Sequence, residues 1–285
     1  MASARSKITI RSLMQMKAEG RRIAALGVYD APMAAIADQI GFEILMIGNS
    51  GPMSLFGYRE STRIPREDLL FMTAAVSRVT KYGLVIATMP YMSSLLSAEE
   101  AIRTAAWLIS QGGADCVQCH ADRHSAGNVL AMVRAGIPVL AHIGLQSVRK
   151  TAQSGFGVRG KTASAAAEIA EDAFKLAEAG VFGLVVELVP SEVTGYLRKR
   201  LEIPVLSLGS GANADGIYQV SADVVGFSVF PRPKTSAQFV DVRPVMERGL
   251  LSLFENIRAR SNAIGADEHT MPPDQAALLK DMLAQ

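Results

Sequence analysis

Two side chains in this sequence are suited to catalysis beside a carbonyl group, Glu187 as the proton-transfer residue and His142 as a partner that orients the carbonyl. Glu187 is the only carboxylate in the apolar run Val185–Pro190, and burial in such a run raises the pKa of a carboxylic acid toward the range of a proton carrier. His142 lies in Ala141–Gly144, and an imidazole titrates near neutral pH. A structural role stays open for each residue. Glu187 could instead pair with a barrel arginine or lysine, and His142 could be a hydrogen-bonded core histidine.

Both residues lie near the ends of short apolar runs that recur along the chain, with helix-like stretches between them. This alternation of strand and helix is typical of a parallel sheet. Eight repeats predict a closed (β/α)8 barrel, the TIM barrel fold, in which the carboxyl ends of the strands carry the active site. The predicted strands are Arg22–Asp30, Phe42–Ser50, Leu84–Pro90, Cys116–His120, Pro138–Gly144, Gly183–Pro190, Pro204–Gly211 and Val224–Phe230.

Other polar residues stand at the ends of these runs, where a hydrophobic core would not favour them. Because all parallel strands of a barrel end at one rim, we expect these side chains to line one pocket with the catalytic pair Glu187 and His142. The residues predicted to bind substrate are Asn49, Ser50, Thr88, Gln118 and His120. Further strand ends carry Asp30, Ser207 and Ser210.

Cys116, Cys119, His120 and His124 have a spacing that suggests metal ligands, but strand geometry argues against such a site. Side chains alternate between the two faces of a strand, so Cys119 and His120 point in opposite directions. A zinc site needs ligands that converge on one point. We therefore interpret the two cysteines as packed thiols and predict no metal here.

Capping residues and glycines that follow helix ends predict the helices. Their ranges are Ser12–Gly20, Pro32–Ile40, Arg66–Lys81, Ser97–Gln111, Ala163–Ala179, Ser191–Leu201 and Phe239–Ser261. The sequence shows no domain boundary. We therefore expect residues 1–285 to form one barrel domain, with a short N-terminal helix and a C-terminal extension beyond Ala263.

Two connections are longer than simple turns, residues 51–64 and Gln146–Thr162. The second combines three glycines with several cations, so we predict a mobile basic cover over the active site that is less ordered without ligand than the strands. Its cations are Arg149, Lys150, Arg159 and Lys161. The glycine-rich stretch Gly209–Gly216 is interpreted as a tight rim loop with a possible backbone contact to a substrate carboxylate.

Composition narrows the class of partner. The net charge is +2 and the basic residues are scattered, which argues against a dedicated nucleic-acid or membrane surface. No apolar run approaches the roughly 20 residues that span a bilayer. The N-terminal residues show no hydrophobic signal core, so a cytoplasmic location is expected. Two cysteines are too few for a disulfide scaffold, and a small-molecule substrate is the predicted partner.

Several short motifs follow one another in an order seen in a known family. They are Lys7–Ile10, Val28–Asp30, Ile47–Ser50, Gly57-Tyr58, Met89–Met92, Ala141–Leu145, Gly160–Thr162, Glu187–Pro190 and Asp215-Gly216. With them, the chain resembles ketopantoate hydroxymethyltransferase from about Lys7 to the final barrel helix. The resemblance implies a barrel of the phosphoenolpyruvate mutase/isocitrate lyase superfamily that transfers a one-carbon unit from methylene-tetrahydrofolate to α-ketoisovalerate. It also implies a magnesium requirement and a large homo-oligomer, a decamer.

The chain departs from the family pattern at the metal site. Where the pattern has two magnesium-binding aspartates, this chain has Asn49 and Thr88, and where it has Lys-x-Glu, this chain has Gln118 and His120. The matching residues are Ser50, His142 and Glu187. The four residues of this chain carry no net charge, and the charged residues of the family pattern also sum to zero once the magnesium ion is counted. The changes therefore predict a consistent neutral pocket. We therefore expect no magnesium at these positions and predict no other cofactor. Methylene-tetrahydrofolate is a possible co-substrate.

Together, the residues and the resemblance predict an enzyme that forms or cleaves a carbon–carbon bond beside the carbonyl of a small 2-oxo acid, through an enolate. In place of a metal, an oxyanion hole of preorganised donors would stabilise the enolate. Its predicted donors are Asn49, Thr88, Gln118 and His120. Hydroxymethyl transfer is the first choice. The alternatives are a metal-independent lyase, aldolase or isomerase with another carbonyl substrate, and a non-catalytic paralogue.

Overall fold

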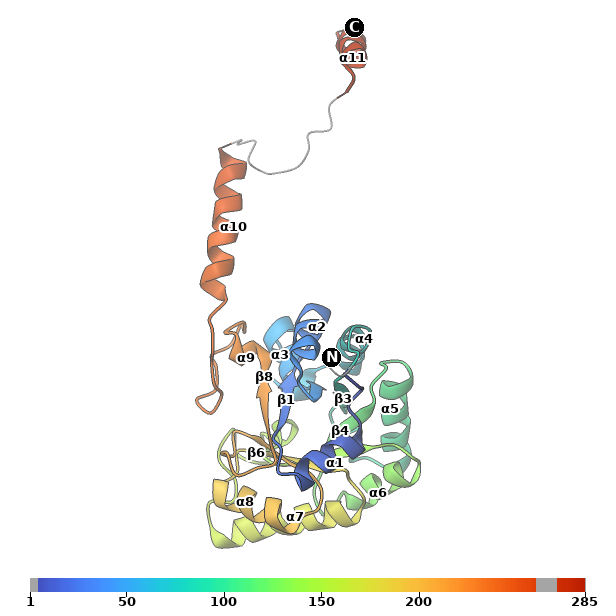
Figure 1. The fold of residues 1–285 in the computed structure, drawn as a ribbon, viewed down its shortest axis with the longest axis vertical. Helices are drawn as coiled ribbons and strands as arrows, with labels where there is room; N and C mark the ends of the chain where they lie inside the picture. Colours follow the sequence, from blue (N-terminus) through green and yellow to red (C-terminus); the bar gives the residue numbers. More distant parts are fainter. Residues whose placement is uncertain (1–4, 260–270, 285) are drawn as a thin grey trace. The chain divides into compact units, whose positions relative to one another are not determined.

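The computed structural model describes residues 5–259 and 271–284. Eight parallel strands follow one another around a closed barrel, and β8 pairs with β1 to close it (Figure 1). The strands are β1 (Ile23–Gly27), β2 (Ile44–Ile47), β3 (Leu84–Thr88), β4 (Cys116–His120), β5 (Val139–Gly144), β6 (Gly183–Glu187), β7 (Val205–Leu208) and β8 (Gly216–Val220). The predicted (β/α)8 barrel is confirmed, and each of the first seven predicted ranges contains the observed strand.

The eighth predicted strand is wrong. The predicted range Val224–Phe230 begins at the last residue of a short helix, α9 (Ser221–Val224), and contains exposed apolar side chains. Strand β8 instead starts at Gly216, at the end of the glycine-rich loop, where a Cβ would lie 2.4 Å from the backbone oxygen of Ile23. Strand β8 is short and partly polar, with Tyr218 packed in the barrel interior. A search for a continuous apolar run therefore does not find this strand.

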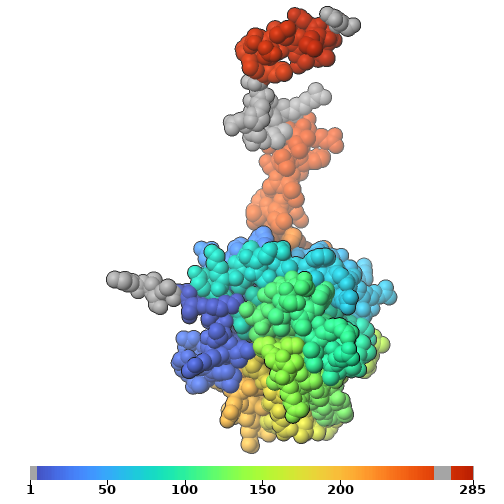
Figure 2. All heavy atoms as spheres, turned by 90° about the vertical axis from the view of Figure 1, so that its right-hand side faces the viewer, coloured from blue at the N-terminus to red at the C-terminus, as the bar shows by residue number. Residues whose placement is uncertain are grey.

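The helices of the barrel unit agree with the predicted ranges, apart from three that were not predicted, α3, α6 and the short α9. Besides α9, they are α1 (Ile10–Ala18), α2 (Ala31–Ile40), α3 (Ser50–Phe56), α4 (Arg66–Ser77), α5 (Ala98–Ser110), α6 (Ala126–Arg134), α7 (Ala163–Glu178) and α8 (Ser191–Arg200). Helices α5 and α6 pack side by side on the face seen in Figure 2. The long connection 51–64 is thus partly helical, since α3 and a 3-10 turn (Ser61–Arg63) lie in it.

Four of these helices start at side chains that satisfy their first backbone N–H groups. In each case, a side-chain oxygen of the residue before the helix accepts a hydrogen bond from the backbone of the third helical residue. The four caps are Thr9, Asp30, Ser97 and Thr162. Such caps fix where a helix leaves its strand, and so where the strand end lies at the rim.

The strands are buried on both faces, and successive side chains alternate between two hydrophobic clusters. Cys116 packs in the barrel interior with Ile86 and Leu140, whereas Cys119 packs in the layer between barrel and helices. Both cysteines are free thiols, and burial raises the pKa of each to about 12. The prediction of two packed thiols on opposite faces is therefore confirmed.

The chain divides into two compact units, Met1–Val240 and Asp241–Gln285. The first is the barrel. The second contains α10 (Arg243–Arg258) and α11 (Pro273–Leu283), and no residue of either helix is buried. None of the helices in the described parts of the chain is long and apolar enough to cross a membrane.

The last predicted barrel helix, Phe239–Ser261, overlaps α10. The observed helix begins later, at Arg243, and belongs to the second unit. The predicted end at Ser261 and the start of the predicted extension after Ala263 lie outside the described residues. A proline at the start of α10 explains the later beginning, because its fixed φ favours the first turn of a helix.

At the amino-terminal ends of the strands, Asp215 joins three segments. Its carboxylate lies 2.6 Å from Lys17 Nζ and 3.0 Å from Arg198 Nε, and it accepts the backbone N–H of Val205 at 2.9 Å. The Asp215 side chain is 4% exposed and that of Lys17 is 12% exposed. This buried ion pair links α1, α8 and β7 on the side of the barrel opposite the catalytic rim.

We predict that Asp215→Ala lowers the free energy of unfolding by about 3–5 kcal/mol, because it leaves the Lys17 ammonium buried without its partner. Urea unfolding measures this change. Glu178→Ala, which removes an exposed pair with Lys175, serves as the control and should leave the unfolding midpoint unchanged. Equal effects of the two variants would contradict the role given to Asp215.

Candidate active site

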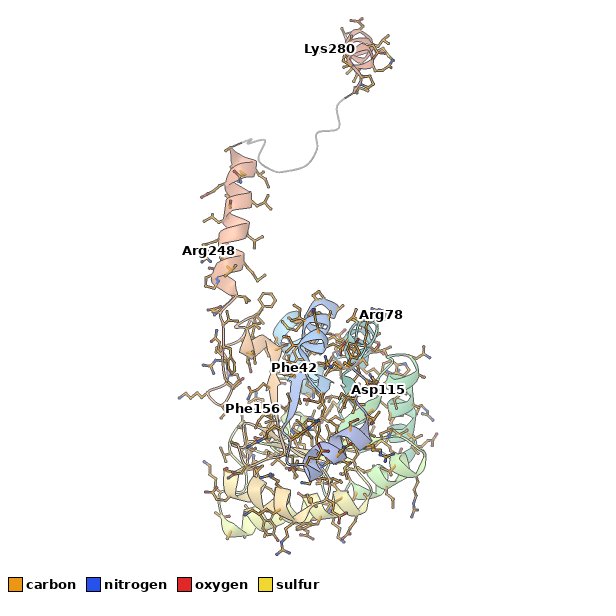
Figure 3. All side chains as sticks on the ribbon, viewed as in Figure 1. Phe42, Arg78, Asp115, Phe156, Arg248 and Lys280 are labelled. Atoms are coloured by element: carbon orange, nitrogen blue, oxygen red, sulfur yellow. The ribbon has the colours of Figure 1, made fainter. Side chains whose placement is uncertain are left out.

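A cavity of about 720 Å³ lies at the carboxyl ends of the strands, a size suited to small-molecule ligands. All seven predicted site residues line it: Asn49, Ser50, Thr88, Gln118, His120, His142 and Glu187. Phe156, labelled in Figure 3, adds a ring from the segment that follows β5, and Tyr218 adds one from β8. The fold therefore brings the predicted residues to one place, and their hydrogen bonds indicate what each can do.

His142 and Glu187 form the polar centre of this cavity. His142 Nε2 lies 2.8 Å from Glu187 Oε2 and 3.1 Å from the carbonyl oxygen of Leu145. In the described part of the chain, the side chain that contacts the Glu187 carboxylate is this histidine and not an arginine or lysine. The Glu187 side chain is 20% exposed, so the carboxylate can contact a ligand while His142 supports it from behind.

Thr88 is hydrogen-bonded to Gln118, and Gln118 is hydrogen-bonded in turn to His142. Thr88 Oγ1 donates to Gln118 Oε1, and the Gln118 amide nitrogen contacts His142 Nδ1. All three residues are almost fully buried. The predicted oxyanion hole counted Thr88 and Gln118 as donors to the substrate, but the structure uses the Thr88 hydrogen and one Gln118 amide hydrogen within the protein.

Asn49 and His120 supply the donors that stay free. Asn49 Nδ2 and His120 Nδ1 are buried and have no hydrogen-bond partner among the described residues. An unpaired buried polar atom costs about 1–3 kcal/mol, so these two atoms indicate a ligand with acceptor oxygens. Burial lowers the pKa of His120 well below its usual value, and the Arg149 guanidinium lowers it further, so this imidazole is neutral.

Two tyrosines that were not among the predicted site residues lie near Ser50. The Ser50 Oγ lies 2.5 Å from the Tyr29 hydroxyl, and Tyr218 lines the same cavity as Ser50. Burial raises the pKa of both tyrosines, so both keep their hydrogens. The hydrogen bond with Tyr29 leaves Ser50 Oγ further hydrogen-bonding capacity for a ligand. Tyr29 stands next to the predicted strand end Asp30, and Tyr218 was missed together with β8.

Other polar strand ends serve the fold. Asp30 caps α2 by accepting the backbone N–H of Met33. Ser210 Oγ donates to the Val186 carbonyl at 2.8 Å and accepts the backbone N–H of Val189 at 2.9 Å, while Ser207 Oγ accepts the backbone N–H of Ser210. These bonds attach the glycine-rich loop to β6 and leave Asp30, Ser207 and Ser210 outside the chemistry.

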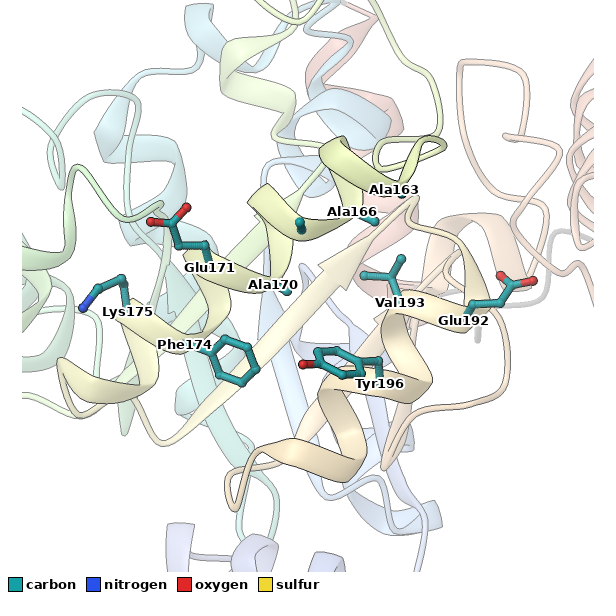
Figure 4. A pocket seen from close by; sticks show the side chains of 10 residues that line it. Ala163, Ala166, Ala170, Glu171, Phe174, Lys175, Glu192, Val193 and Tyr196 are labelled. Carbon is teal, nitrogen blue, oxygen red and sulfur yellow. The ribbon is translucent and has the colours of Figure 1, made fainter.

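A second hollow, of about 560 Å³, lies on the outer surface between α7 and α8 (Figure 4). Small alanine side chains line much of it, and the rings of Phe174 and Tyr196 meet edge to face with centroids 6.3 Å apart. None of the predicted site residues reaches it. The polar groups that could support proton transfer are therefore concentrated in the barrel cavity.

Residues 7–262 match the sequence model of the ketopantoate hydroxymethyltransferase family. The chain belongs to this family. A 3-methyl-2-oxobutanoate hydroxymethyltransferase of Thermoanaerobacter sp. (strain X514) is 35% identical over 254 residues, covering 88% of this chain and 92% of that one. Its counterpart in Carboxydothermus hydrogenoformans is 33% identical over 270 residues, covering 94% and 97%. The family resemblance of the sequence motifs is thus confirmed over the barrel.

Solved structures share the fold at low sequence identity. Phosphonopyruvate hydrolase in complex with oxalate and Mg++ matches with a TM-score of 0.60 at 11% identity, over 96% of this chain and 95% of that one. A 2,3-dimethylmalate lyase of the PEP mutase/isocitrate lyase superfamily matches with a TM-score of 0.56 at 16% identity, over 97% and 99%. These similarities establish the barrel type of this family member and no chemistry.

The magnesium ion that the family pattern implies does not fit the residues of this chain. An amide and a hydroxyl, those of Asn49 and Thr88, stand where the pattern has two carboxylates, and hard cations favour charged oxygen ligands. Thr88 Oγ1 is already bonded to Gln118, and the Asn49 amide leaves a donor unpaired. In the residues that the structure describes, no group of three or more His, Cys, Asp or Glu is placed to hold a metal.

The predicted cover, Gln146–Thr162, is attached to the barrel rim. Arg149 forms an ion pair with Asp122, and Gln146 Nε2 donates to the Ala121 carbonyl at 2.8 Å. Burial alone would raise the pKa of Asp122, but Arg149, with help from Ser125, holds it below its usual value. The carboxylate is therefore charged at neutral pH, and this ion pair fixes the start of the segment.

Farther along the cover, Lys150 lies 5.1 Å from the ring centroid of Phe156, and both line the cavity. Arg159 Nη2 donates to the Gly155 carbonyl at 2.7 Å. Cations of the segment thus have partners within it, and the lower order predicted for the ligand-free segment stays a prediction.

We predict that Arg149→Met accelerates backbone hydrogen exchange in residues 146–153 by about tenfold. The variant loses the partly buried ion pair with Asp122 that attaches this segment to the barrel rim. Exchange followed by mass spectrometry measures this, with β5 and β6 as internal references. Lys161→Met removes a cation from the exposed end of the same segment and is the matched control. Unchanged exchange in the Arg149 variant would show that other contacts fix the segment.

Proposed function

We propose that this protein catalyses hydroxymethyl transfer to a small 2-oxo acid, forming a carbon–carbon bond beside the carbonyl through an enolate. The observation that carries the proposal is the Glu187 carboxylate at the cavity, hydrogen-bonded to His142 and surrounded by neutral donors. A carboxylate in that position is suited to accept a proton from carbon.

In the proposed reaction, Glu187 removes the proton from the carbon next to the substrate carbonyl. The electron pair of that bond moves toward the carbonyl oxygen and produces the enolate, and the proton stays on the carboxylate. Asn49 Nδ2 and His120 Nδ1, in the tautomer that carries its hydrogen there, would donate to the oxygen as negative charge develops. His142 orients the carboxylate throughout.

The choice of partners rests on the family and on the cavity lining. The enolate carbon needs an electrophilic one-carbon unit, and methylene-tetrahydrofolate is the donor that the family resemblance implies. Phe156, Phe230, Arg59 and Lys150 line the same cavity, a combination of rings and cations that suits a flat, anionic co-substrate. The relatives are named for 3-methyl-2-oxobutanoate, which is therefore the first acceptor to test. A homo-oligomer, which the resemblance implies, and a cytoplasmic location, which the N-terminal residues predict, both stay predictions.

We predict that Glu187→Gln lowers kcat by about two to four orders of magnitude, because an amide can accept the His142 hydrogen bond but cannot take a proton. Two readouts apply: product formation with methylene-tetrahydrofolate, and exchange of the substrate proton for solvent deuterium, which needs no co-substrate. Replacing His142 should cost less, because Asn49 and His120 would still contact the oxyanion.

Glu192→Gln, which changes an exposed carboxylate on α8, is the control and should keep wild-type rates. Melting temperatures are measured in parallel. A folded Glu187→Gln variant with near-normal exchange would show that the carboxylate is structural. Exchange without transfer would instead favour a lyase, aldolase or isomerase on the same enolate.

We also predict that a chelator leaves the exchange rate unchanged and that added magnesium does not raise it, because Asn49 and Thr88 replace the carboxylate ligands. The matched comparison is the double variant Asn49→Asp/Thr88→Asp, which should gain magnesium binding in a calorimetric titration. Activity that is lost with chelator and restored by magnesium in the wild type would overturn the metal-independent mechanism.

A further inference from the structure

The hydrogen on His142 can be located from its neighbours. A backbone carbonyl oxygen has no hydrogen to donate, and the Leu145 oxygen lies 3.1 Å from His142 Nε2. Nε2 must therefore carry a hydrogen, which it can also direct at Glu187 Oε2, 2.8 Å away. The remaining question is whether Nδ1 carries one too.

The orientation of the Gln118 side-chain amide decides whether His142 Nδ1 carries a hydrogen. With its nitrogen toward Nδ1, Gln118 donates and the imidazole is neutral. The opposite direction would place an oxygen against Nδ1 and require an imidazolium. Thr88 favours the first arrangement, because its hydroxyl then donates to Gln118 Oε1. In the reversed arrangement Thr88 would lose this acceptor, the only one to which its hydroxyl donates among the described residues, at a side chain that is 2% exposed.

We propose that Thr88 and Gln118 are positioning residues that hold His142 in the neutral tautomer with its hydrogen on Nε2, so that His142 always presents a donor to Glu187. The chain runs in one direction, from the Thr88 hydroxyl through the Gln118 amide and the imidazole to the carboxylate. This inference rests on the proposed function, in which Glu187 is the base.

The tautomer matters because it sets the state of the base. With the hydrogen on Nδ1 instead, a bare nitrogen would face the Glu187 carboxylate, and the two lone pairs would repel unless Glu187 were protonated. A protonated Glu187 cannot accept a proton from the substrate. Thr88 and Gln118, two of the four residues that replace charged groups of the family pattern, thus gain a specific role in keeping the base available.

Nitrogen NMR of the full-length protein tests the tautomer without substrate. The sequence has four histidines, so selective ¹⁵N-histidine labelling gives few signals, and the His142→Gln variant assigns those of His142. At neutral pH we expect an N–H signal for Nε2 and an unprotonated signal for Nδ1. A hydrogen on Nδ1 in the wild type would overturn the proposal.

Variants of the chain extend the test. Gln118→Glu puts an acceptor against Nδ1 and should convert its signal to the N–H type, whereas Gln118→Leu removes the donor without adding charge and should give a mixture. Thr88→Val removes the hydroxyl with little change of shape and should also give a mixture, and Thr88→Ser should restore the wild-type signal. If the Gln118 variants do not fold, the Thr88 pair provides the same test.

Turnover separates positioning from binding. We expect kcat of Gln118→Leu to fall by about 10-fold to 100-fold, with a much smaller change in KM. Gln111→Glu, at an exposed helix end, is the control for Gln118→Glu. Unchanged NMR signals and kcat in both Gln118 variants would overturn the proposal. If instead the signals shift as expected but Glu187→Gln keeps its turnover, the hydrogen-bond chain stands and the proposed base is wrong.

Discussion

The contact between the Leu145 carbonyl and His142 is the constraint on which the active site depends, because an oxygen that can only accept decides where the imidazole hydrogen lies. Gly144 makes this contact possible. It has a φ of 85°, and a Cβ there would lie 2.4 Å from the Glu187 backbone oxygen. Leu145 N–H in turn donates to that oxygen at 2.8 Å. One close approach of the ends of β5 and β6 therefore positions both the imidazole and the carboxylate.

Around this pair, the cavity has neutral donors where the family pattern has charges. Replacing one aspartate alone would have left unbalanced charge in a buried site, which is costly. In this chain, the Thr88 hydroxyl donates to the Gln118 amide, while Asn49 Nδ2 and His120 Nδ1 have no hydrogen-bond partner in the part of the chain that the structure describes. Some polar groups of the site thus hold the base in place, and others are available to donate to an acceptor oxygen of a ligand. Enolate chemistry requires both kinds of group, whether a cation or a set of hydrogen-bond donors stabilises the enolate.

The two ends of the barrel carry different functions. At the amino-terminal ends, the buried carboxylate of Asp215 is fully committed to Lys17, Arg198 and a backbone N–H. At the carboxyl ends, some buried polar atoms have no hydrogen-bond partner within residues 5–259 and 271–284. This separation allows residues such as Asn49 and Thr88 to differ from the family pattern while the strands that carry them keep their places, because the fold draws its stability from the core and the opposite end.

The sequence by itself determined the barrel, seven of its strands and the residues that reach its rim, because apolar runs, caps and strand ends are local patterns. It did not determine β8, which is short and partly polar, or the hydrogen bond between Ser50 and Tyr29. Tertiary structure alone decided the hydrogen-bond partners. Thr88 stands in register with Gln118 and His120 with His142 across neighbouring strands, and that register is set by closure of the whole barrel, which no local pattern records.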